Sequence, residues 1–519
     1  MKKAILLLLF TAGTLNSSSI KQETLYSKNK LQKERALITF DQFMGVNAFV
    51  DDPIDKMQSV GFIREYHNWS WDEGNGKGEY QSYPTNNIKW APSEVEPWNF
   101  DRFYNQINEA GLTIAPCIQG SVNWLSKGEK FKSSNKPLDK LGLSATDPFS
   151  YHKKAHYMFQ FAARYGFTHV DEQKLTLASG QALNSGMGLI KYLEDWNEQD
   201  KDWEGREAQF SPQEYAAMLS ANYDGHVNTM KSGSGTFGIK NADPHMKVVM
   251  GGLATPSIEY IQNMKTWFEE NRSDKKFAAD VINVHQYTWK DGKGWQGGGP
   301  ALSPEEGGLK ELMQSFVEYR NKNLPEMEVW ISEFGWDTHP KSPLSPPPIG
   351  PFDIFEVQAQ WLVRAYLAFA AAGVDRAQMY MLRDVDPKDS TWFSTSGLVG
   401  PKGDWTPKKS WYYVHTLKNT LKNMRFIGEQ TASNPKLLIY KFKDISNSTG
   451  AYVIWAATRE NYTVKDYLLP LQAKAKTARL VQLAPNEIVG KATSLSIAEG
   501  QVKVDVSERP IFIMVDNMM

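Results

Sequence analysis

Two glutamates stand at the ends of apolar runs that we interpret as buried strands. Glu198 follows Asn197 at the end of segment 192–198, and Glu333 lies in segment 329–335. Hydrolysis of a glycosidic bond with retention of configuration requires two carboxyl groups about 5–5.5 Å apart, on opposite sides of that bond. The pair therefore predicts this chemistry, with Glu198 as the general acid/base and Glu333 as the nucleophile.

The residues around this pair fit the two roles. Asn197 could hydrogen-bond the sugar hydroxyl next to the reacting carbon. A nucleophile has to be ionised and so needs a cation or hydrogen-bond donors nearby; Arg64 and Tyr287 are the donors that we expect. His285 shares a face with Tyr287 and would line the same site. Strict alternation puts Asn197 and Glu198 on opposite faces of their strand, so the strand has to break at its end.

Aromatic side chains could supply sugar-binding surfaces. They make up 12% of the 519 residues and include 17 tryptophans. A tryptophan is costly to bury unless its indole N–H finds a partner, so some are expected to stack on sugar rings, while others pack in the core. The tryptophans that we expect to contact substrate are Trp69, Trp124, Trp336 and Trp392.

Composition argues against several other functions. The net charge is −1 and no block of Lys and Arg occurs, so nucleic acid is not an expected partner. The nine histidines are scattered, and His152 and His156 lack the glutamate of a zinc-peptidase helix, so no metal site is predicted. The single cysteine, Cys117, lies in an apolar run and is interpreted as a small buried residue.

The first residues are typical of a secretory signal. Two lysines precede a short apolar run, and we assign residues 1–20 to this signal. The run is too short for a membrane span, which needs about 20 apolar residues. We therefore expect a bacterial protein that is exported to the periplasm or secreted.

Repeated strand and helix patterns must position the two glutamates. Between residues 43 and 423, eight short apolar runs alternate with amphipathic segments, which predicts a (β/α)₈ TIM barrel over residues 36–423. In such a barrel all strand-to-helix loops lie on the face of the active site, and long loops there would wall a groove for a polymer. The predicted strands are 44–48, 62–66, 112–119, 191–196, 247–251, 281–287, 328–333 and 377–382.

The pattern changes after the predicted barrel. Residues 424–519 contain short alternating runs and no segment with a helical period, which predicts a C-terminal β-sandwich domain. The predicted strands there are 436–442, 451–457, 478–482, 502–506 and 510–515.

As a set, these residues resemble glycoside hydrolase clan A over about residues 43–423. The resemblance implies a TIM barrel, a covalent glycosyl-enzyme intermediate, retention of configuration and no cofactor. The matching positions are Asn197 and Glu198, Glu333 in Trp-Ile-Ser-Glu-Phe-Gly, Arg64, and the strand with His285 and Tyr287.

The eighth predicted strand departs from the clan pattern. Many members place a tryptophan at its end, beneath the reacting sugar, whereas this chain reads Gln-Met-Tyr-Met-Leu-Arg-Asp. Tyr380, Arg383 and Trp392 are the alternatives for that position.

The size, the export signal and the trailing β-domain are also similar to bacterial polysaccharide-degrading enzymes, including glycoside hydrolase family 157, which acts on β-1,3-glucan. This resemblance implies a secreted endo-β-glycanase whose partner is a polysaccharide or oligosaccharide. Two alternatives stay open: an exo-acting β-glycosidase, and a catalytically silent carbohydrate-binding barrel, for which paired carboxylates would have no use. The sequence predicts no particular oligomeric state.

Overall fold

The computed structural model describes residues 35, 37–73, 89–93, 98–125, 132–230, 237–290, 299–472 and 474–519. The expected signal, residues 1–20, lies outside this part of the chain. Among the described residues, no helix has the length and apolar character needed to cross a membrane.

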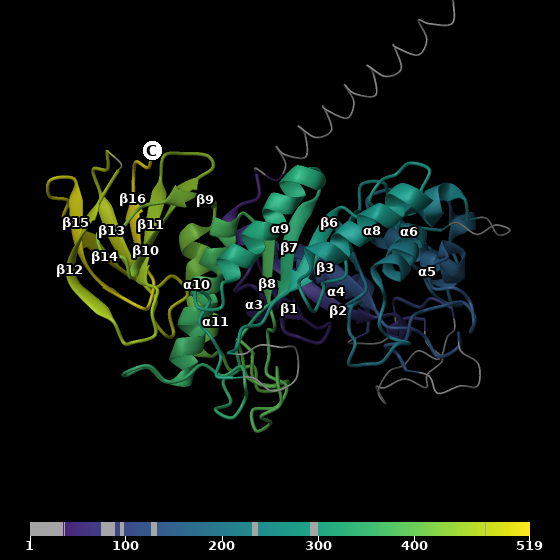
Figure 1. Cartoon of the computed structure of the whole chain (residues 1–519), viewed down its shortest axis with the longest axis horizontal. Coiled ribbons are helices and arrows are strands. Elements are labelled where there is room, and N and C mark those ends of the chain that lie inside the picture. Colours follow the sequence, from purple (N-terminus) through teal and green to yellow (C-terminus); the bar gives the residue numbers. More distant parts are fainter. Residues whose placement is uncertain are drawn as a thin grey trace, which may run out of the picture.

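Eight parallel strands close into a barrel in chain order, as the sequence predicts (Figure 1). The strand β1 pairs with both β2 and β8, which closes the ring. The barrel strands are β1 (Met44–Ala48), β2 (Phe62–Asn68), β3 (Thr113–Gln119), β4 (Tyr192–Asp195), β5 (Lys247–Met250), β6 (Val281–His285), β7 (Glu328–Glu333) and β8 (Arg376–Met379). The (β/α)₈ prediction is therefore confirmed.

Helices alternate with these strands and cover the outside of the barrel. The start of α6 is set by a capping box, because Ser211 Oγ accepts from the Glu214 N–H and the Glu214 carboxylate accepts from the Ser211 N–H. The helices are α2 (Phe40–Phe43), α3 (Ile54–Met57), α4 (Phe100–Glu109), α5 (His152–Tyr165), α6 (Pro212–Asn228), α7 (Ile239–Ala242), α8 (Ile258–Asn271), α9 (Leu309–Asn323), α10 (Ile354–Ala372) and α11 (Lys409–Leu421).

Large side chains fill the barrel interior at the amino-terminal ends of the strands. The rings of Phe62 and Trp330 pack edge to face at 5.2 Å, and the Arg376 guanidinium lies 4.5 Å from the Phe62 ring. This plug closes one end of the barrel, so a site for a ligand is left at the carboxyl ends of the strands. The buried residues of the plug are Phe62, Ala115, Tyr192, Val249, Val281 and Trp330.

The C-terminal domain is made of antiparallel strands, as predicted. A six-stranded sheet in the order β14-β13-β16-β11-β10-β9 faces a two-stranded sheet of β12 and β15, and an apolar cluster from both sheets lies between them. The strands are β9 (Met424–Glu429), β10 (Leu437–Asp444), β11 (Gly450–Ala456), β12 (Thr463–Pro470), β13 (Ala478–Gln482), β14 (Lys491–Leu495), β15 (Gln501–Ser507) and β16 (Ile511–Val515).

Three of these strands, β9, β12 and β14, are absent from the sequence prediction. All five residues of β14 are exposed or half-exposed, and β12 buries only two of its eight residues. Strands with so little burial do not show the alternation of apolar and polar residues on which the prediction depends.

The other face of the six-stranded sheet packs on the barrel. In Figure 1 the yellow-green β-domain lies beside α10 and α11. Tyr440, Phe442 and Trp455 belong to the same apolar cluster as the barrel helices. The half-buried carboxylate of Glu305, which precedes α9, accepts hydrogen bonds from Trp455 Nε1 at 2.9 Å and Arg364 Nε at 3.0 Å. The two domains therefore share one core.

Candidate active site

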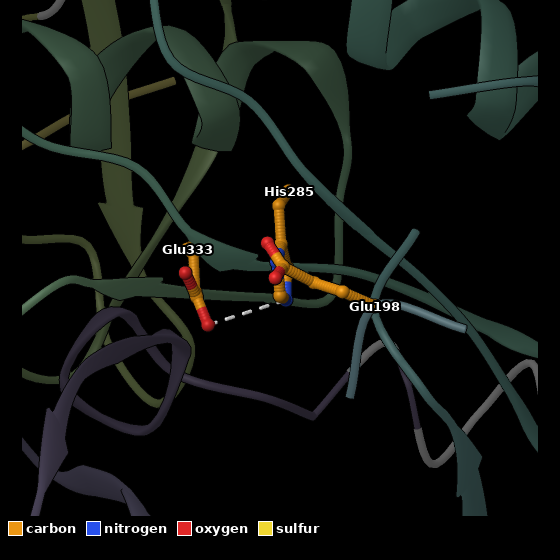
Figure 2. A group of neighbouring side chains, drawn as sticks. All are labelled: Glu198, His285 and Glu333. Carbon is orange, nitrogen blue, oxygen red and sulfur yellow. Dashed lines mark hydrogen bonds and ion pairs between the residues drawn. The ribbon is translucent and has the colours of Figure 1, made fainter. Parts of the chain in front are cut away.

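The two predicted glutamates meet at the carboxyl ends of β4 and β7. One oxygen of Glu198, one oxygen of Glu333 and a ring nitrogen of His285 all lie within 4.8 Å of one another. Figure 2 shows the two carboxylates approaching each other from separate segments, with the imidazole of His285 beside both. This separation fits the roughly 5–5.5 Å of a retaining pair better than the roughly 6.5–9.5 Å of an inverting pair.

The expected break at the end of β4 is present. The strand ends at Asp195, and both Trp196 (φ 87°) and Glu198 (φ 49°) have left-handed backbone conformations. Hydrogen bonds from the Glu198 N–H to Gly252 O (3.0 Å) and from the Trp196 N–H to Ile118 O (3.0 Å) hold this turn. Such conformations cost about 1–3 kcal/mol each and cluster at functional sites. Here the turn directs Asn197 and Glu198 into one site.

Hydrogen-bond donors surround Glu333, whose side chain is only 6% exposed. Its Oε1 accepts from Arg64 Nη1 (2.8 Å) and from the Tyr66 hydroxyl, and its Oε2 accepts from the Tyr287 hydroxyl (2.9 Å). Burial would raise the pKa of Glu333, but His285, Arg64 and the two hydroxyls together lower it below its ordinary value. The carboxylate is therefore held ionised, which a nucleophile requires.

Arg64 ties the two strand ends together. Besides Glu333, its guanidinium donates to Asn197 Oδ1 (2.7 Å) and Asn47 Oδ1 (2.8 Å). It also makes a two-pronged ion pair with Glu194, at 2.6 and 2.8 Å. Glu194 lies on β4, four residues before Glu198, and is wholly buried, so it neutralises Arg64 and is not exposed to substrate.

His285 bridges the two carboxylates. Its Nδ1 lies 3.2 Å from Glu198 Oε1, and its Nε2 lies 3.1 Å from Ser332 Oγ and 3.6 Å from Glu333 Oε1. The ring is only 1% exposed. Its position suits it to orient the acid/base rather than to contact solvent.

The structure corrects two of the four tryptophan predictions. Trp69 and Trp336 are buried, at 0% and 1% exposure, so neither has an open face for a sugar. Their indole N–H groups donate to Glu73 Oε2 and Leu302 O, which explains how they are tolerated in the interior.

The other two tryptophans are half-buried near the site. Trp124 packs against Trp69, with its Nε1 donating to the Glu73 carbonyl at 2.9 Å. Trp392 packs on Trp289 at 5.1 Å and stands next to Phe393, whose ring contacts Tyr287 at 4.6 Å. Both are partly exposed and follow β3 and β8, at the carboxyl ends of the barrel strands.

Of the three alternatives for the position beneath the reacting sugar, Tyr380 packs against the tyrosine that binds Glu333. It is half-buried at the end of β8, and its ring packs edge to face against Tyr66 (6.0 Å) and Phe393 (5.6 Å). Burial and the negative charges of Glu333 and Glu198 raise the pKa of its hydroxyl. The second alternative, Arg383, is instead engaged with acidic residues after β1.

Sequence reasoning missed three residues that shape the site: Tyr66, Asn47 and Ser332. Tyr66 had a detectable signal, because it lies two residues after Arg64 and so on the same face of β2. Asn47 binds Arg64 and donates to Ser332 O (2.8 Å) and Met379 O (3.1 Å), contacts that no local pattern indicates.

Within the described residues, Glu198, His285 and Glu333 are the group that could offer ligand atoms to a metal ion. The donor set does not fit that role, because the guanidinium of Arg64 and two tyrosine hydroxyls already occupy both oxygens of Glu333. The loops expected to wall a groove lie partly outside the described residues, at 74–88, 126–131 and 291–298.

Comparisons with known proteins agree with this architecture. No family model and no curated protein matches the sequence. A family 39 glycoside hydrolase from Bacteroides cellulosilyticus WH2 is similar in structure, with 15% identity, a TM-score of 0.56, and 91% of this chain and 80% of that chain covered. A family 30 endoxylanase from Clostridium papyrosolvens C71 has 10% identity, a TM-score of 0.54, and coverages of 91% and 96%.

A third similar structure is a family 51 α-L-arabinofuranosidase from Thermotoga petrophila RKU-1, with 12% identity, a TM-score of 0.52, and coverages of 89% and 88%. The fold is that of glycoside hydrolases from families 39, 30 and 51. All three families belong to clan A, the group that the sequence resembles. Nothing in these matches favours family 157.

Proposed function

We propose that this chain is a retaining glycoside hydrolase. The observation that carries the proposal is the approach of Glu198 and Glu333 to within 4.8 Å, with Glu333 bound by a guanidinium and two hydroxyls. Both stand at the face of a TIM barrel where active sites are built. Similar structures from three glycoside hydrolase families support the same conclusion.

The geometry supports a double displacement. Glu333 attacks the anomeric carbon while Glu198 donates a proton to the departing oxygen, which leaves a glycosyl ester on Glu333. Glu198 has given up its proton at this point, so it can accept one from the incoming water. That water attacks the anomeric carbon, displaces the Glu333 carboxylate and gives its proton to Glu198, which releases a sugar with its original configuration.

For the substrate, we propose a β-linked polysaccharide, with β-1,3-glucan as the first polymer to test. The expected export signal agrees with a polymer, because a polysaccharide reaches an exported enzyme without crossing the cytoplasmic membrane. One similar structure is an endoxylanase and another an α-L-arabinofuranosidase, so xylan and arabinan belong in the same panel. Chromatography of the products would separate endo action from the exo alternative.

The test combines stereochemistry with substitution. NMR of the first product should show retention of configuration. Glu333→Ala and Glu198→Gln should each lower turnover by at least about three orders of magnitude, because one removes the covalent step and the other the proton transfer. The control Glu109→Gln changes an exposed glutamate on α4 and should leave turnover unchanged.

Three outcomes would contradict the proposal. Near-normal activity of either active-site variant would remove that glutamate from the mechanism. Inversion of configuration would exclude the covalent intermediate. Binding of a polymer without any hydrolysis across the panel would favour the silent binding barrel.

A further inference from the structure

A row of flat side chains begins at Tyr66, which binds Glu333, and continues toward the surface. The ring of Phe49, directly after β1, stacks on Tyr66 at 5.6 Å with an interplanar angle of 18°. The guanidinium of Arg383, after β8, lies 4.8 Å from the Phe49 ring and 5.7 Å from the ring of Trp405. We call Phe49, Arg383 and Trp405 the distal platform.

The distal platform is held in place by two aspartates, of which Asp52 is buried. Arg383 Nη1 lies 3.0 Å from Asp52 Oδ1 and 3.4 Å from Asp51 Oδ1. The other oxygen of Asp52 accepts from the Phe49 N–H at 2.9 Å, so the same carboxylate fixes two members of the platform. Because Asp51 and Asp52 neutralise Arg383, and Lys402 pairs with Asp51, the surface carries little net charge. It therefore suits an uncharged ligand with a flat apolar face.

The platform stays accessible in part. Phe49 and Trp405 are half-buried, and the Arg383 side chain is 15% exposed. All three lie beyond the carboxyl ends of β1 and β8 or in the loop before α11, on the face that holds the glutamates. Phe49 and Arg383 lie against their neighbours within this stack, so the exposed part of the Trp405 ring is the surface offered to the C–H face of a sugar, and the guanidinium N–H groups can donate to hydroxyls.

The chemistry assigns a direction to the substrate. The departing sugar leaves with the oxygen that Glu198 protonates, so it lies on the β4 side. The sugar that Glu333 attacks, and any sugar attached to its non-reducing end, extends away from β4. In an eight-stranded ring β8 lies opposite β4, and β1 is next to β8. The distal platform is therefore on the side of the attacked sugar.

We infer that the distal platform binds the second sugar on the non-reducing side of the cleaved bond. The inference rests on the proposed function and deepens it, because an enzyme with this contact binds at least two sugars on the non-reducing side of the cleaved bond. It favours cleavage within a chain over removal of single terminal sugars.

The test compares two aryl glycosides that share a leaving group. For β-1,3-glucan these are 4-nitrophenyl β-glucoside and 4-nitrophenyl β-laminaribioside; if the panel selects xylan, the xylose pair replaces them. Trp405→Ala should lower kcat/KM for the disaccharide about tenfold, as expected for loss of one aromatic contact. Its kcat/KM for the monosaccharide glycoside should stay within about twofold.

Two further variants separate binding from stability. Arg383→Lys keeps the charge beside Asp52 but removes the planar face, so it should show the same selective loss. Phe167→Ala removes an aromatic ring that is 55% exposed after α5, and it should affect neither glycoside. In the inactive Glu333→Ala background, Trp405→Ala should weaken calorimetric binding of laminarihexaose, a readout that needs no turnover.

Equal losses on both glycosides, or no loss on either together with unchanged binding of laminarihexaose, would overturn the inference. Neither result would affect the proposed function, since hydrolysis with retention would persist. Failure of the unmodified enzyme to cleave any polymer or glycoside would instead overturn the proposed function.

Discussion

The two glutamates have the same side chain, and the different roles that we propose for them follow from their different neighbours. Glu333 has both oxygens occupied by donors and the guanidinium of Arg64 beside it. Glu198 is more exposed, at 15% of its side chain, and contacts His285 instead. When two carboxyl groups in one site have different surroundings, one of them can stay ionised while the other serves as a proton donor.

At this scale we predict that Tyr66→Phe changes the pH dependence of activity. The pKa of Glu333 is lowered partly by the Tyr66 hydroxyl, so removal of that donor raises it. The nucleophile has to be ionised, and its ionised fraction falls as pH drops through its pKa. The acidic limb of the kcat/KM profile should therefore move to higher pH. Tyr412→Phe on α11 is the control, and an unchanged acidic limb in Tyr66→Phe would contradict the prediction.

At the scale of elements, the ends of neighbouring strands hold one another in place. Gly252 follows β5, accepts from the Glu198 N–H at 3.0 Å and donates to Glu194 Oε1 at 3.3 Å. A Cβ atom at this position would lie 2.0 Å from His285 Nε2. Only glycine leaves room for the imidazole between the two carboxylates.

We therefore predict that Gly252→Ala lowers kcat/KM at least about tenfold, because His285 has to move away from Glu198. The control is Gly111→Ala, where the added methyl group meets no atom within 4 Å but the φ of +74° is unfavourable. That variant should lose stability and keep its activity. Thermal unfolding and steady-state kinetics of both variants check the prediction, and activity of Gly252→Ala within twofold of the parent would refute it.

At the scale of the whole molecule, the β-domain completes the core of the barrel. Trp455 on β11 packs with the barrel helices and donates to the half-buried carboxylate of Glu305. Burial would raise the pKa of Glu305, but Arg364 and this indole lower it. A carboxylate held ionised across the domain boundary makes the unfolding of the two domains interdependent.

We predict that Trp455→Phe costs about 1.5–3 kcal/mol of unfolding free energy more than Trp361→Phe. Both tryptophans are fully buried, but the Trp361 N–H has no hydrogen-bond partner in the described part of the chain. The two variants thus lose similar apolar surface, and only the first leaves Glu305 short of a donor. Guanidinium chloride unfolding measures the difference, and equal costs would show that the hydrogen bond does not stabilise the protein.

The sequence by itself determined the barrel and the location of its chemistry. Barrel strands are buried on both faces and read as short runs rich in apolar residues, so all eight could be found. Glu198 and Glu333 could be placed because each ends such a run, and the carboxyl ends of parallel strands meet on one face. The break after β4 followed from the alternation of side chains along a strand, because Asn197 and Glu198 would otherwise point to opposite faces and could not share a site.

Only the tertiary structure decided which aromatic and polar side chains reach the site. Trp69 and Trp336 look no different in sequence from Trp124 and Trp392, yet they are buried. Glu194 pairs with Arg64 from a strand 130 positions away in the chain. Burial and pairing of this kind depend on contacts between segments that are distant in the sequence. The short-range periodicity of a sequence does not predict such contacts.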